Sequence, residues 1–401
     1  MLDVSNLNFV LVLKYSSMNK FVISISLFCL ILNACAQGPV KDNKEDGSNN
    51  EIVIQPGIGH TYALVDYLTE NTQLDKDVDS IFNTLDNHSR IAHLLMPAVG
   101  RLGLTNEEIS EQVKKNLIGG VILLNGSKEE FSMWIKSYNA LNPLHKSLPF
   151  LYSADAEPTL FNRKISGSTQ VKKANEIKTQ EEVIDCATTI SNDLNAIGIN
   201  YNFAPVVDVS KNSTVGYRGF GAIPSNIIPC SNAFIKTTQD LGIIATAKHF
   251  PGHGLVSGDT HKSLQMIEGE LKEISNYPPL IENGLLSIMV AHIAVLNNKK
   301  YNTKGLPATA SSEIVQKLLR EELKFKGLII TDAMNMGGIS SLIDAEVKVI
   351  EAGCDIVLMP LDVEKSHAKL LAKYTNDLAF QKKVDTAVKR IMRMKLCLAK
   401  G

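Results

Sequence analysis

The stretch FKGLIITDAM, residues 325–334, joins a short apolar run directly to a carboxylate. Its centre, residues 327–331, is apolar almost without interruption and rich in isoleucine. Such a run is typical of a strand that is buried on both faces, and strands of this kind belong to parallel sheets covered by helices. The stretch therefore predicts an α/β fold in which Asp332 stands at the end of a buried strand.

Seven similar runs lie along the chain on either side of this one, and longer stretches with helical spacing separate them, for example residues 181–196 and 227–241. Eight strands that alternate with helices over about 300 residues favour closure into a (β/α)8 barrel of the TIM type. We therefore predict a single barrel domain, with an open doubly wound sheet as the alternative. The predicted strands are residues 93–99, 120–124, 150–154, 199–207, 243–248, 287–293, 327–331 and 355–359.

Polar residues follow these strands. Asp155 comes after the third strand, Asp208 after the fourth and His249 after the fifth, while His292 lies near the end of the sixth and Asp332 ends the seventh. Active sites of TIM barrels lie at the C-terminal ends of the strands. The chemistry of this protein is therefore expected at that end of the barrel.

The segment KHFPGHGLVSGDTH, residues 248–261, carries four side chains that could bind a metal: His249, His253, Asp259 and His261. Their spacing lacks an HExxH-like helical pairing, and the proline and glycines among them place the group on a loop. We therefore expect no metal at this loop. A purely structural role for His253 remains open at this point.

KHFPGHG followed by DTH resembles glycoside hydrolase family 3, and in particular its β-N-acetylglucosaminidase (β-N-acetylhexosaminidase) branch. The resemblance extends over about residues 75–400 and implies a barrel enzyme that needs no cofactor. Further motifs that carry it are GGVILL at 119–124, NFAPVVDV at 202–209, VAH at 290–292, PATAS at 307–311 and FKGLIITDAMNM at 325–336.

The same resemblance implies that Asp332 is the nucleophile and that Asp259 and His261 together form the acid/base. Cleavage of a glycosidic bond needs an anionic nucleophile beneath the anomeric carbon and a proton donor beside the leaving oxygen. An imidazole beside a carboxylate can supply that proton, because the carboxylate favours the protonated ring and orients it. The implied roles are therefore chemically coherent.

Five residues are implied as sugar ligands. Asp155 and Arg163 are eight residues apart, as in the family pattern DxEGGxxxR, and the arginine of RGFG, residues 218–221, stands where the family has RSFG. For either arginine, an ordinary salt bridge is the alternative role. The implied ligands are Asp155, Arg163, Arg218, Lys248 and His249.

These features together predict a retaining exo-β-N-acetylglucosaminidase that acts through a covalent glycosyl–Asp332 intermediate on an amino-sugar glycan or muropeptide. A β-glucosidase or β-xylosidase is one alternative, but those members usually carry the acid/base on an additional domain, for which no room is expected after Gly401. Phosphorolysis is a second alternative. A third is an inactive glycan-binding lipoprotein, because Pro158 and Thr159 replace the family's glycine pair.

The N-terminus has the pattern of an export signal. An apolar run, residues 21–32, follows Lys20, and LNAC at 32–35 resembles a bacterial lipobox. We expect Met18 as the start, cleavage before a lipidated Cys35, a tether and extension over residues 36–74 and the barrel over 75–401. This organisation predicts an exported lipoprotein of the cell envelope, held to the membrane by the lipid.

The charge of the chain is balanced, with 41 basic and 42 acidic residues. A protein that binds a polyanion usually carries a clear excess of positive charge. Nucleic acid is therefore not an expected partner.

Overall fold

The computed structural model describes residues 60–142, 148–212 and 214–398. The predicted signal peptide, Cys35 and the tether as far as residue 59 lie outside the described residues. In the three described ranges, no helix combines the length and the apolar character needed to cross a bilayer.

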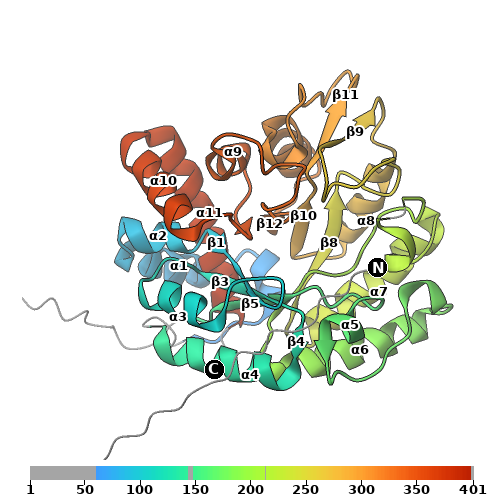
Figure 1. The fold of residues 1–401 in the computed structure, drawn as a ribbon, viewed down its shortest axis with the longest axis horizontal. Coiled ribbons are helices and arrows are strands. Elements are labelled where there is room, and N and C mark those ends of the chain that lie inside the picture. Colours follow the sequence, from blue (N-terminus) through green and yellow to red (C-terminus); the bar gives the residue numbers. More distant parts are fainter. Residues whose placement is uncertain (1–59, 143–147, 213, 399–401) are drawn as a thin grey trace, which may run out of the picture. The chain divides into compact units, whose positions relative to one another are not determined.

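Seven strands form one parallel sheet, and each strand pairs with its neighbour in chain order (Figure 1). Their nearly unbroken apolar sequences suit a sheet that has the barrel interior on one face and helices on the other. The strands are β2 (Ala98–Gly100), β3 (Gly120–Leu124), β5 (Leu151–Ala154), β7 (Tyr201–Asn202), β8 (Ile244–Phe250), β10 (Ser287–Val290) and β12 (Leu328–Thr331).

The sheet closes on itself through two further short strands. β13 (Val357–Leu358) pairs in parallel with β1 (Leu95–Met96), which precedes β2 directly in the chain. A parallel bridge between Ile330 and Ile356 joins β12 to the segment that enters β13. The ring of eight parallel strand positions is thus complete, and the predicted (β/α)8 barrel is confirmed.

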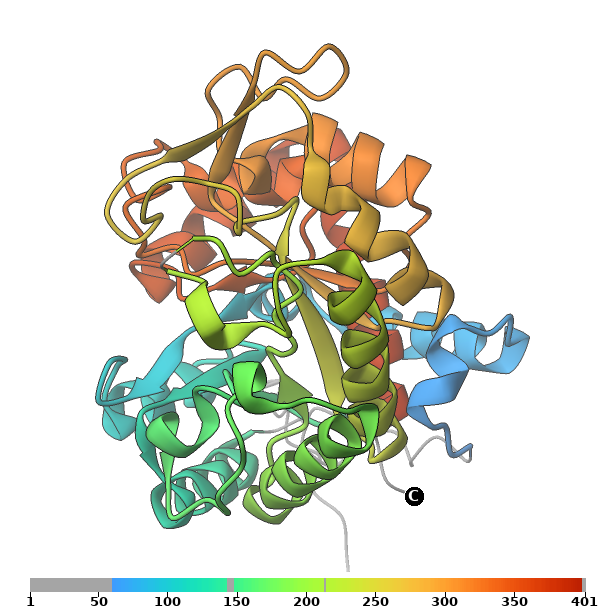
Figure 2. The ribbon, with the colours of Figure 1, turned by 90° about the vertical axis from the view of Figure 1, so that its right-hand side faces the viewer.

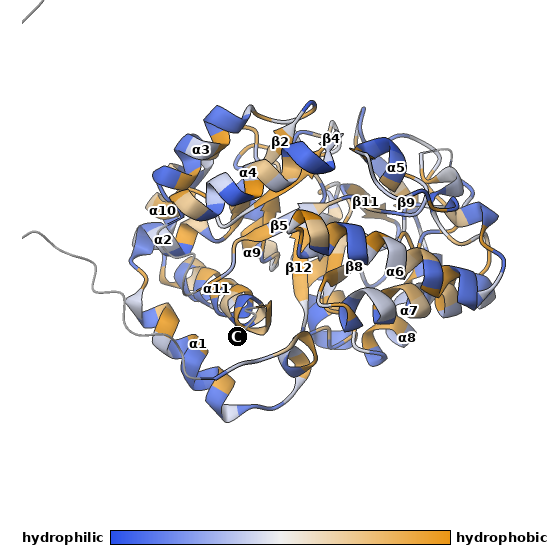
Figure 3. Ribbon diagram, turned by 90° about the horizontal axis from the view of Figure 1, so that it is seen from below, coloured by the Kyte–Doolittle hydropathy of each residue, from blue (hydrophilic) through white to orange (hydrophobic). Residues whose placement is uncertain are grey.

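Helices surround the barrel. Figure 3 shows the apolar strands β5, β8 and β12 inside a ring of helices whose outer faces are polar. The α-helices are α1 (Thr72–Thr84), α2 (Asn87–Ala92), α3 (Asn106–Lys114), α4 (Lys128–Leu141), α5 (Phe161–Lys164), α6 (Gln180–Ile197), α7 (Pro224–Asp240), α8 (Tyr277–Glu282), α9 (Ala345–Ala352), α10 (Val363–Asn376) and α11 (Leu378–Leu398). The 3₁₀ segments are η1 (Leu64–Leu68), η2 (Ala174–Glu176), η3 (Gly216–Arg218), η4 (Lys272–Asn276) and η5 (Ala308–Ala310), and η6 (Glu313–Glu322) is a π-helix.

Local sequence explains where several helices begin and end. Thr105 caps α3 and Ser127 caps α4, each in a capping box with the glutamate three residues later. Gly198 ends α6 with a φ of 100°, a left-handed conformation that glycine adopts without a steric penalty. The chain can therefore turn from α6 into β7. Figure 2 shows α7 between α6 and α8, over the β7 and β8 side of the barrel.

Several predicted strands are shorter in the structure, among them 355–359, which is reduced to β13. The strand predicted at 199–207 is divided: β7 ends at Asn202, and a separate parallel bridge joins Val206 to Lys248. The strand predicted at 287–293 stops at Val290, and β11 (Ile293–Leu296) then pairs with β9 (Gln265–Glu268) in a separate sheet (Figure 1). A third small sheet joins β4 (Gly126–Ser127) to β6 (Ile165–Ser166).

Candidate active site

A cavity of about 540 Å³ lies at the C-terminal ends of the barrel strands. The loops after the third, fourth, fifth and seventh strand positions supply its polar lining. It brings together seven predicted site residues, namely Asp155, Arg163, Arg218, Lys248, His249, His261 and Asp332. The eighth, Asp259, contacts His261 beside the cavity.

Asp332 follows β12, and hydrogen bonds to neighbouring backbone groups hold it in place. Its N–H donates to the carbonyl of Val290 at 2.9 Å, and its Oδ1 accepts from the N–H of Ala333 at 2.8 Å. Burial by itself would raise the pKa of Asp332, but the His249 and His292 rings and the Ala333 N–H hold this pKa below its usual value. The carboxylate is therefore ionised near neutral pH, as a nucleophile requires.

Asp259 and His261 form a hydrogen-bonded pair at the edge of the cavity. Nδ1 of His261 lies 2.8 Å from Oδ1 of Asp259, which leaves Nε2 for exchange of a proton with a substrate. Slight burial raises the pKa of Asp259, but the hydrogen bonds from the side chain and N–H of His261 outweigh it and lower this pKa. The ionised carboxylate therefore orients the ring.

A chain of alternating charges crosses the floor of the cavity. Nζ of Lys248 lies 2.8 Å from Oδ1 of Asp155 and 2.6 Å from Oε1 of Glu157. Nζ of Lys164 lies 2.5 Å from the other oxygen of Asp155, and Arg218 binds both oxygens of Glu157 at 2.5 and 2.8 Å. Three cations thus hold two carboxylates.

Burial makes these charges costly, and each is retained because of its partners. Desolvation would raise the pKa of Glu157, yet Arg218 and Lys248 lower it to about 2. Lys164 and Lys248 lower the pKa of Asp155 against the same burial effect. Burial would lower the pKa of Lys248, but the two carboxylates raise it. Asp155, Glu157 and Lys248 are therefore charged in the physiological range.

Sequence reasoning missed Glu157 and Lys164. Glu157 is fully buried and occupies the second acidic position of the DxE pattern, so its signal was present in the motif. Lys164 was assigned no role, yet it provides the second cation for Asp155. Arg163, the predicted ligand beside it, lines the cavity, and within the described part of the chain its guanidinium has no ion-pair partner. That arginine is free to meet a substrate.

Pro158 fits the turn that holds Glu157. The carbonyl of Glu157 accepts from the N–H groups of Leu160 and Phe161 at 2.9 and 2.8 Å. Pro158 is therefore the second residue of a turn, a position that favours proline and requires no N–H from it. The side chain of Asn202 also accepts from the N–H of Ala156 at 3.1 Å. Replacement of the glycine pair thus leaves the acidic residues in place.

Asp208 organises the histidines of the 248–261 segment. Its buried carboxylate lies 2.7 Å from Nδ1 of His249 and accepts from the N–H of His253 at 2.8 Å. Burial would raise the pKa of Asp208, but His249 lowers it. His292 lies behind the nucleophile, with Nε2 3.1 Å from the carbonyl of Ala333.

The next feature is the placement of side chains that could bind a metal. Among the described residues, no group of three or more histidines, cysteines, aspartates and glutamates is placed to hold a metal ion. The four candidate ligands of the 248–261 segment instead divide between Asp208, Thr260 and the Asp259–His261 pair.

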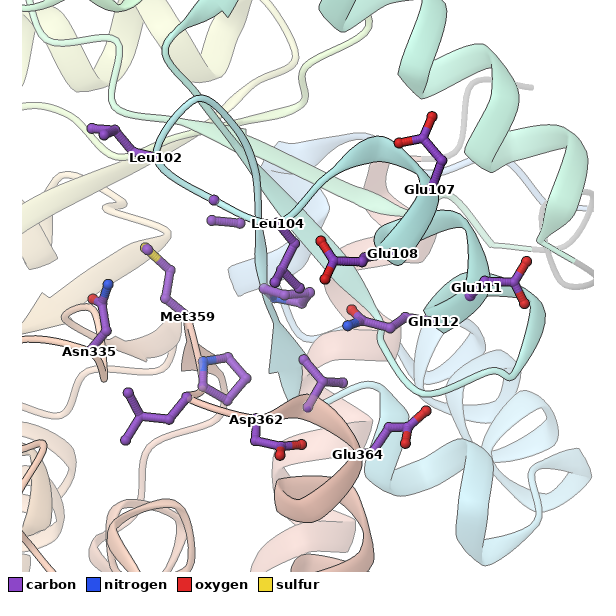
Figure 4. Close-up of a pocket in the computed structure, with 16 residues that line it drawn as sticks. Leu102, Leu104, Glu107, Glu108, Glu111, Gln112, Asn335, Met359, Asp362 and Glu364 are labelled. Atoms are coloured by element: carbon purple, nitrogen blue, oxygen red, sulfur yellow. The ribbon is translucent and has the colours of Figure 1, made fainter.

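A second cavity, of about 630 Å³, adjoins the first between α3 and the start of α10 (Figure 4). The two cavities share Leu102, Asn335 and Met359. Leu102 and Leu361 present apolar surface there, at 65% and 61% exposure. Its acidic lining residues are Glu107, Glu108, Glu111, Asp362 and Glu364.

A parallel (β/α)8 barrel with a carboxylate and an imidazole–carboxylate pair around one cavity has the organisation of a TIM-barrel glycoside hydrolase. The chain belongs to glycosyl hydrolase family 3, since the family described as "Glycosyl hydrolase family 3 N terminal domain" matches residues 85–394.

Relatives within this family carry hexosaminidase names. "Beta-hexosaminidase A" of Pseudoalteromonas piscicida is 30% identical over 332 residues, which cover 72% of this chain and 55% of the relative. "Beta-N-acetylglucosaminidase/beta-glucosidase" of Cellulomonas fimi is 27% identical over 302 residues, which cover 70% of this chain and 52% of the relative. The matched region thus spans about half the length of these two relatives.

The fold is also similar to that of a solved structure. The glycoside hydrolase family 3 β-N-acetylglucosaminidase from Paenibacillus sp. str. FPU-7 superposes with a TM-score of 0.71 at 25% sequence identity. The superposition covers 79% of this chain and 64% of that one.

Proposed function

We propose that this protein is a retaining exo-β-N-acetylglucosaminidase, which hydrolyses terminal β-linked N-acetylglucosamine. The observation that carries the proposal is the arrangement of Asp332 and His261 around one cavity, with Asp259 bound to the histidine. A nucleophile and a proton donor that face the same space can act on one glycosidic bond.

In the first step, the Asp332 carboxylate attacks the anomeric carbon while the bond to the leaving oxygen breaks. His261 donates its proton to that oxygen, and a glycosyl–Asp332 ester forms. In the second step, the neutral His261 takes a proton from water, and the water oxygen attacks the anomeric carbon. This attack releases the sugar, restores the Asp332 carboxylate and returns the proton to His261.

The charged chain from Lys164 to Arg218 and the ring of His249 would hold the sugar hydroxyl groups. Their mutual hydrogen bonds fix these groups before substrate arrives, so little further ordering is needed on binding. The adjoining cavity would receive the remainder of an amino-sugar glycan or muropeptide, because it continues from the first at Leu102 and Met359.

The export pattern supports a place for this activity in the cell envelope. In this proposal, lipid attached to Cys35 holds the protein to a membrane, and residues 36–74 form the tether and extension that connect it to the barrel. Glycans of the envelope would then be the accessible substrates.

A second candidate is β-glucosidase activity, since the Cellulomonas fimi relative is named for both activities. A third is glycan binding without turnover. The ionised Asp332 and the intact Asp259–His261 pair favour turnover, because a protein that only binds glycan has no use for a nucleophile and a proton donor around one cavity.

The test compares release of nitrophenol from the β-N-acetylglucosaminide and the β-glucoside by the purified protein. We expect faster release from the former, and a fall of kcat/KM by a factor of about 10³ or more in Asp332→Asn, which lacks the anionic nucleophile. Full activity of Asp332→Asn would contradict the mechanism. Faster release from the glucoside would favour the second candidate, and binding without release the third.

A further inference from the structure

Thr260, the residue between Asp259 and His261, is buried, and with His253 it lines the same cavity as Asp332. Thr260 is 1% exposed, whereas the side chain of His261 is 61% exposed. Oγ1 of Thr260 lies 3.0 Å from Nε2 of His253, and this contact is buried. The exposed pair is thus attached to the protein interior through the residue between its two members.

His253 is itself firmly placed. Its ring is 2% exposed, and its N–H donates to Asp208 at 2.8 Å. Burial and the neighbouring His249 lower the pKa of His253, with Asp208 and Asp332 opposing them and Arg218 adding to them, so the ring is neutral near pH 7. A neutral imidazole nitrogen and a hydroxyl can form a hydrogen bond without a buried charge.

The backbone of the pair is held from the opposite side. The carbonyl of Thr260 accepts from the N–H of Gly338 at 3.0 Å, and that of His261 accepts from Gly337 at 2.9 Å. A Cβ at Gly337 would lie 2.3 Å from the carbonyl oxygen of Lys262, so this close approach requires glycine. The two glycines follow Asp332 by five and six residues, which ties the acid/base loop to the nucleophile segment.

The two backbone hydrogen bonds from Gly337 and Gly338 fix the path of the loop, but they still allow its peptide units to rotate. Such a rotation would turn the side chains of Asp259 and His261. The hydrogen bond between Thr260 and His253 holds the loop at a further point and opposes this rotation. We propose that the Thr260–His253 hydrogen bond is a positioning clamp, which sets the direction in which His261 presents its proton to the leaving oxygen. This inference rests on the proposed function of the pair.

The test separates positioning of the acid from general damage. Thr260→Val keeps the shape and loses the hydroxyl, whereas Thr260→Ser keeps the hydroxyl. Two substrates are compared: a 3,4-dinitrophenyl β-N-acetylglucosaminide, whose leaving group departs without a proton, and the disaccharide of two β-linked N-acetylglucosamines, whose leaving group needs one. His261→Ala defines the full effect of losing the acid, about 10² to 10⁴ in rate.

We expect Thr260→Val to lower kcat/KM for the disaccharide by about 10-fold or more, since small errors of placement cost up to about 100-fold. The dinitrophenyl substrate should change by less than about twofold on the same argument. Thr260→Ser should keep the wild-type ratio between the substrates. An unchanged ratio in Thr260→Val would overturn the clamp, whether both rates are kept or both fall by the same factor.

Amide hydrogen exchange provides a readout that does not need turnover. Exchange over residues 259–262 and at Gly337 and Gly338 should be faster in Thr260→Val than in Thr260→Ser, and equal exchange would overturn the clamp. If thermal melting shows that the valine variant is unfolded, Thr260→Ala takes its place in both measurements. A wild-type protein that cleaves neither substrate would contradict the proposed function alone, and exchange would still decide on the clamp.

Discussion

Single residues set the charge of this site through buried partners. Glu157 is the clearest example, because it has no exposed surface and bridges Lys248 and Arg218. Loss of one member of a buried ion pair leaves its partners uncompensated, which costs far more than loss of an exposed pair.

Glu157→Gln should therefore destabilise the protein by about 3 kcal/mol at pH 7. The folded-state pKa of about 2 lies below the usual 4.5, so the stabilisation by Glu157 is full above pH 4.5 and is lost as pH falls through 2. Urea unfolding at several pH values measures the difference. Arg163→Gln is the matched control, and we expect its stability to stay within about 0.5 kcal/mol of the wild type. A penalty for Glu157→Gln that did not shrink in acid would contradict this assignment.

At the scale of elements, a second buried carboxyl group holds the turn at the start of the loop that carries Asp259 and His261. Glu273, in η4, accepts from the N–H groups of Val209 at 2.7 Å and Leu255 at 3.1 Å. A Cβ at Gly252 would lie 2.5 Å from Cβ of Glu273, so the loop and η4 are in direct contact. Burial and the neighbouring Asp208 raise the pKa of Glu273 to about 7.

This shift predicts a pH dependence of stability. The raised pKa means that the folded state binds a proton more tightly than the unfolded state, so ionisation of Glu273 costs stability as pH rises from 4.5 through 7. Glu273→Gln removes that titration. We expect its stability relative to the wild type to improve by up to about 3 kcal/mol over this range and to level off above pH 7. A difference independent of pH, measured by denaturant unfolding, would contradict a raised pKa of Glu273 in the folded state.

At the scale of the whole barrel, α11 carries an ionisable side chain into the interior. Lys395 is 1% exposed, and its Nζ lies 2.9 Å from the carbonyl of Gly119 and 3.2 Å from Nδ1 of His93. The structure places no carboxylate against Nζ among the described residues, and burial lowers the pKa of Lys395 to about 7.

Lys395→Met should consequently change how stability responds to pH. A folded-state pKa of 7 against an unfolded value of 10.5 makes the wild type more stable as pH rises from 7 towards 10.5. The methionine variant should therefore gain most relative to the wild type below pH 7, by up to about 4 kcal/mol, and this gain should disappear by about pH 10.5. Thermal unfolding across this range checks the sign. A gain that grew with pH would contradict a lysine that is neutral in the folded state.

Local sequence patterns predicted the strands of the barrel and the end of the barrel that carries the chemistry. These follow from local patterns, namely apolar runs of strand length and polar residues directly after them, as at Asp332. The family motifs added the residues to place in the site. The short β7 was less predictable, because the sequence pattern at 199–207 predicts one strand.

The tertiary structure alone decided how these parts meet. The Ile330–Ile356 bridge closes the barrel, Glu157 joins Lys248 to Arg218, and Thr260 reaches His253. Each of these contacts depends on where loops and strands lie relative to one another, and neither periodicity nor residue type encodes such a pairing. Local sequence thus specifies which side chains reach the C-terminal end of the barrel, whereas packing specifies their partners, their charge and their direction.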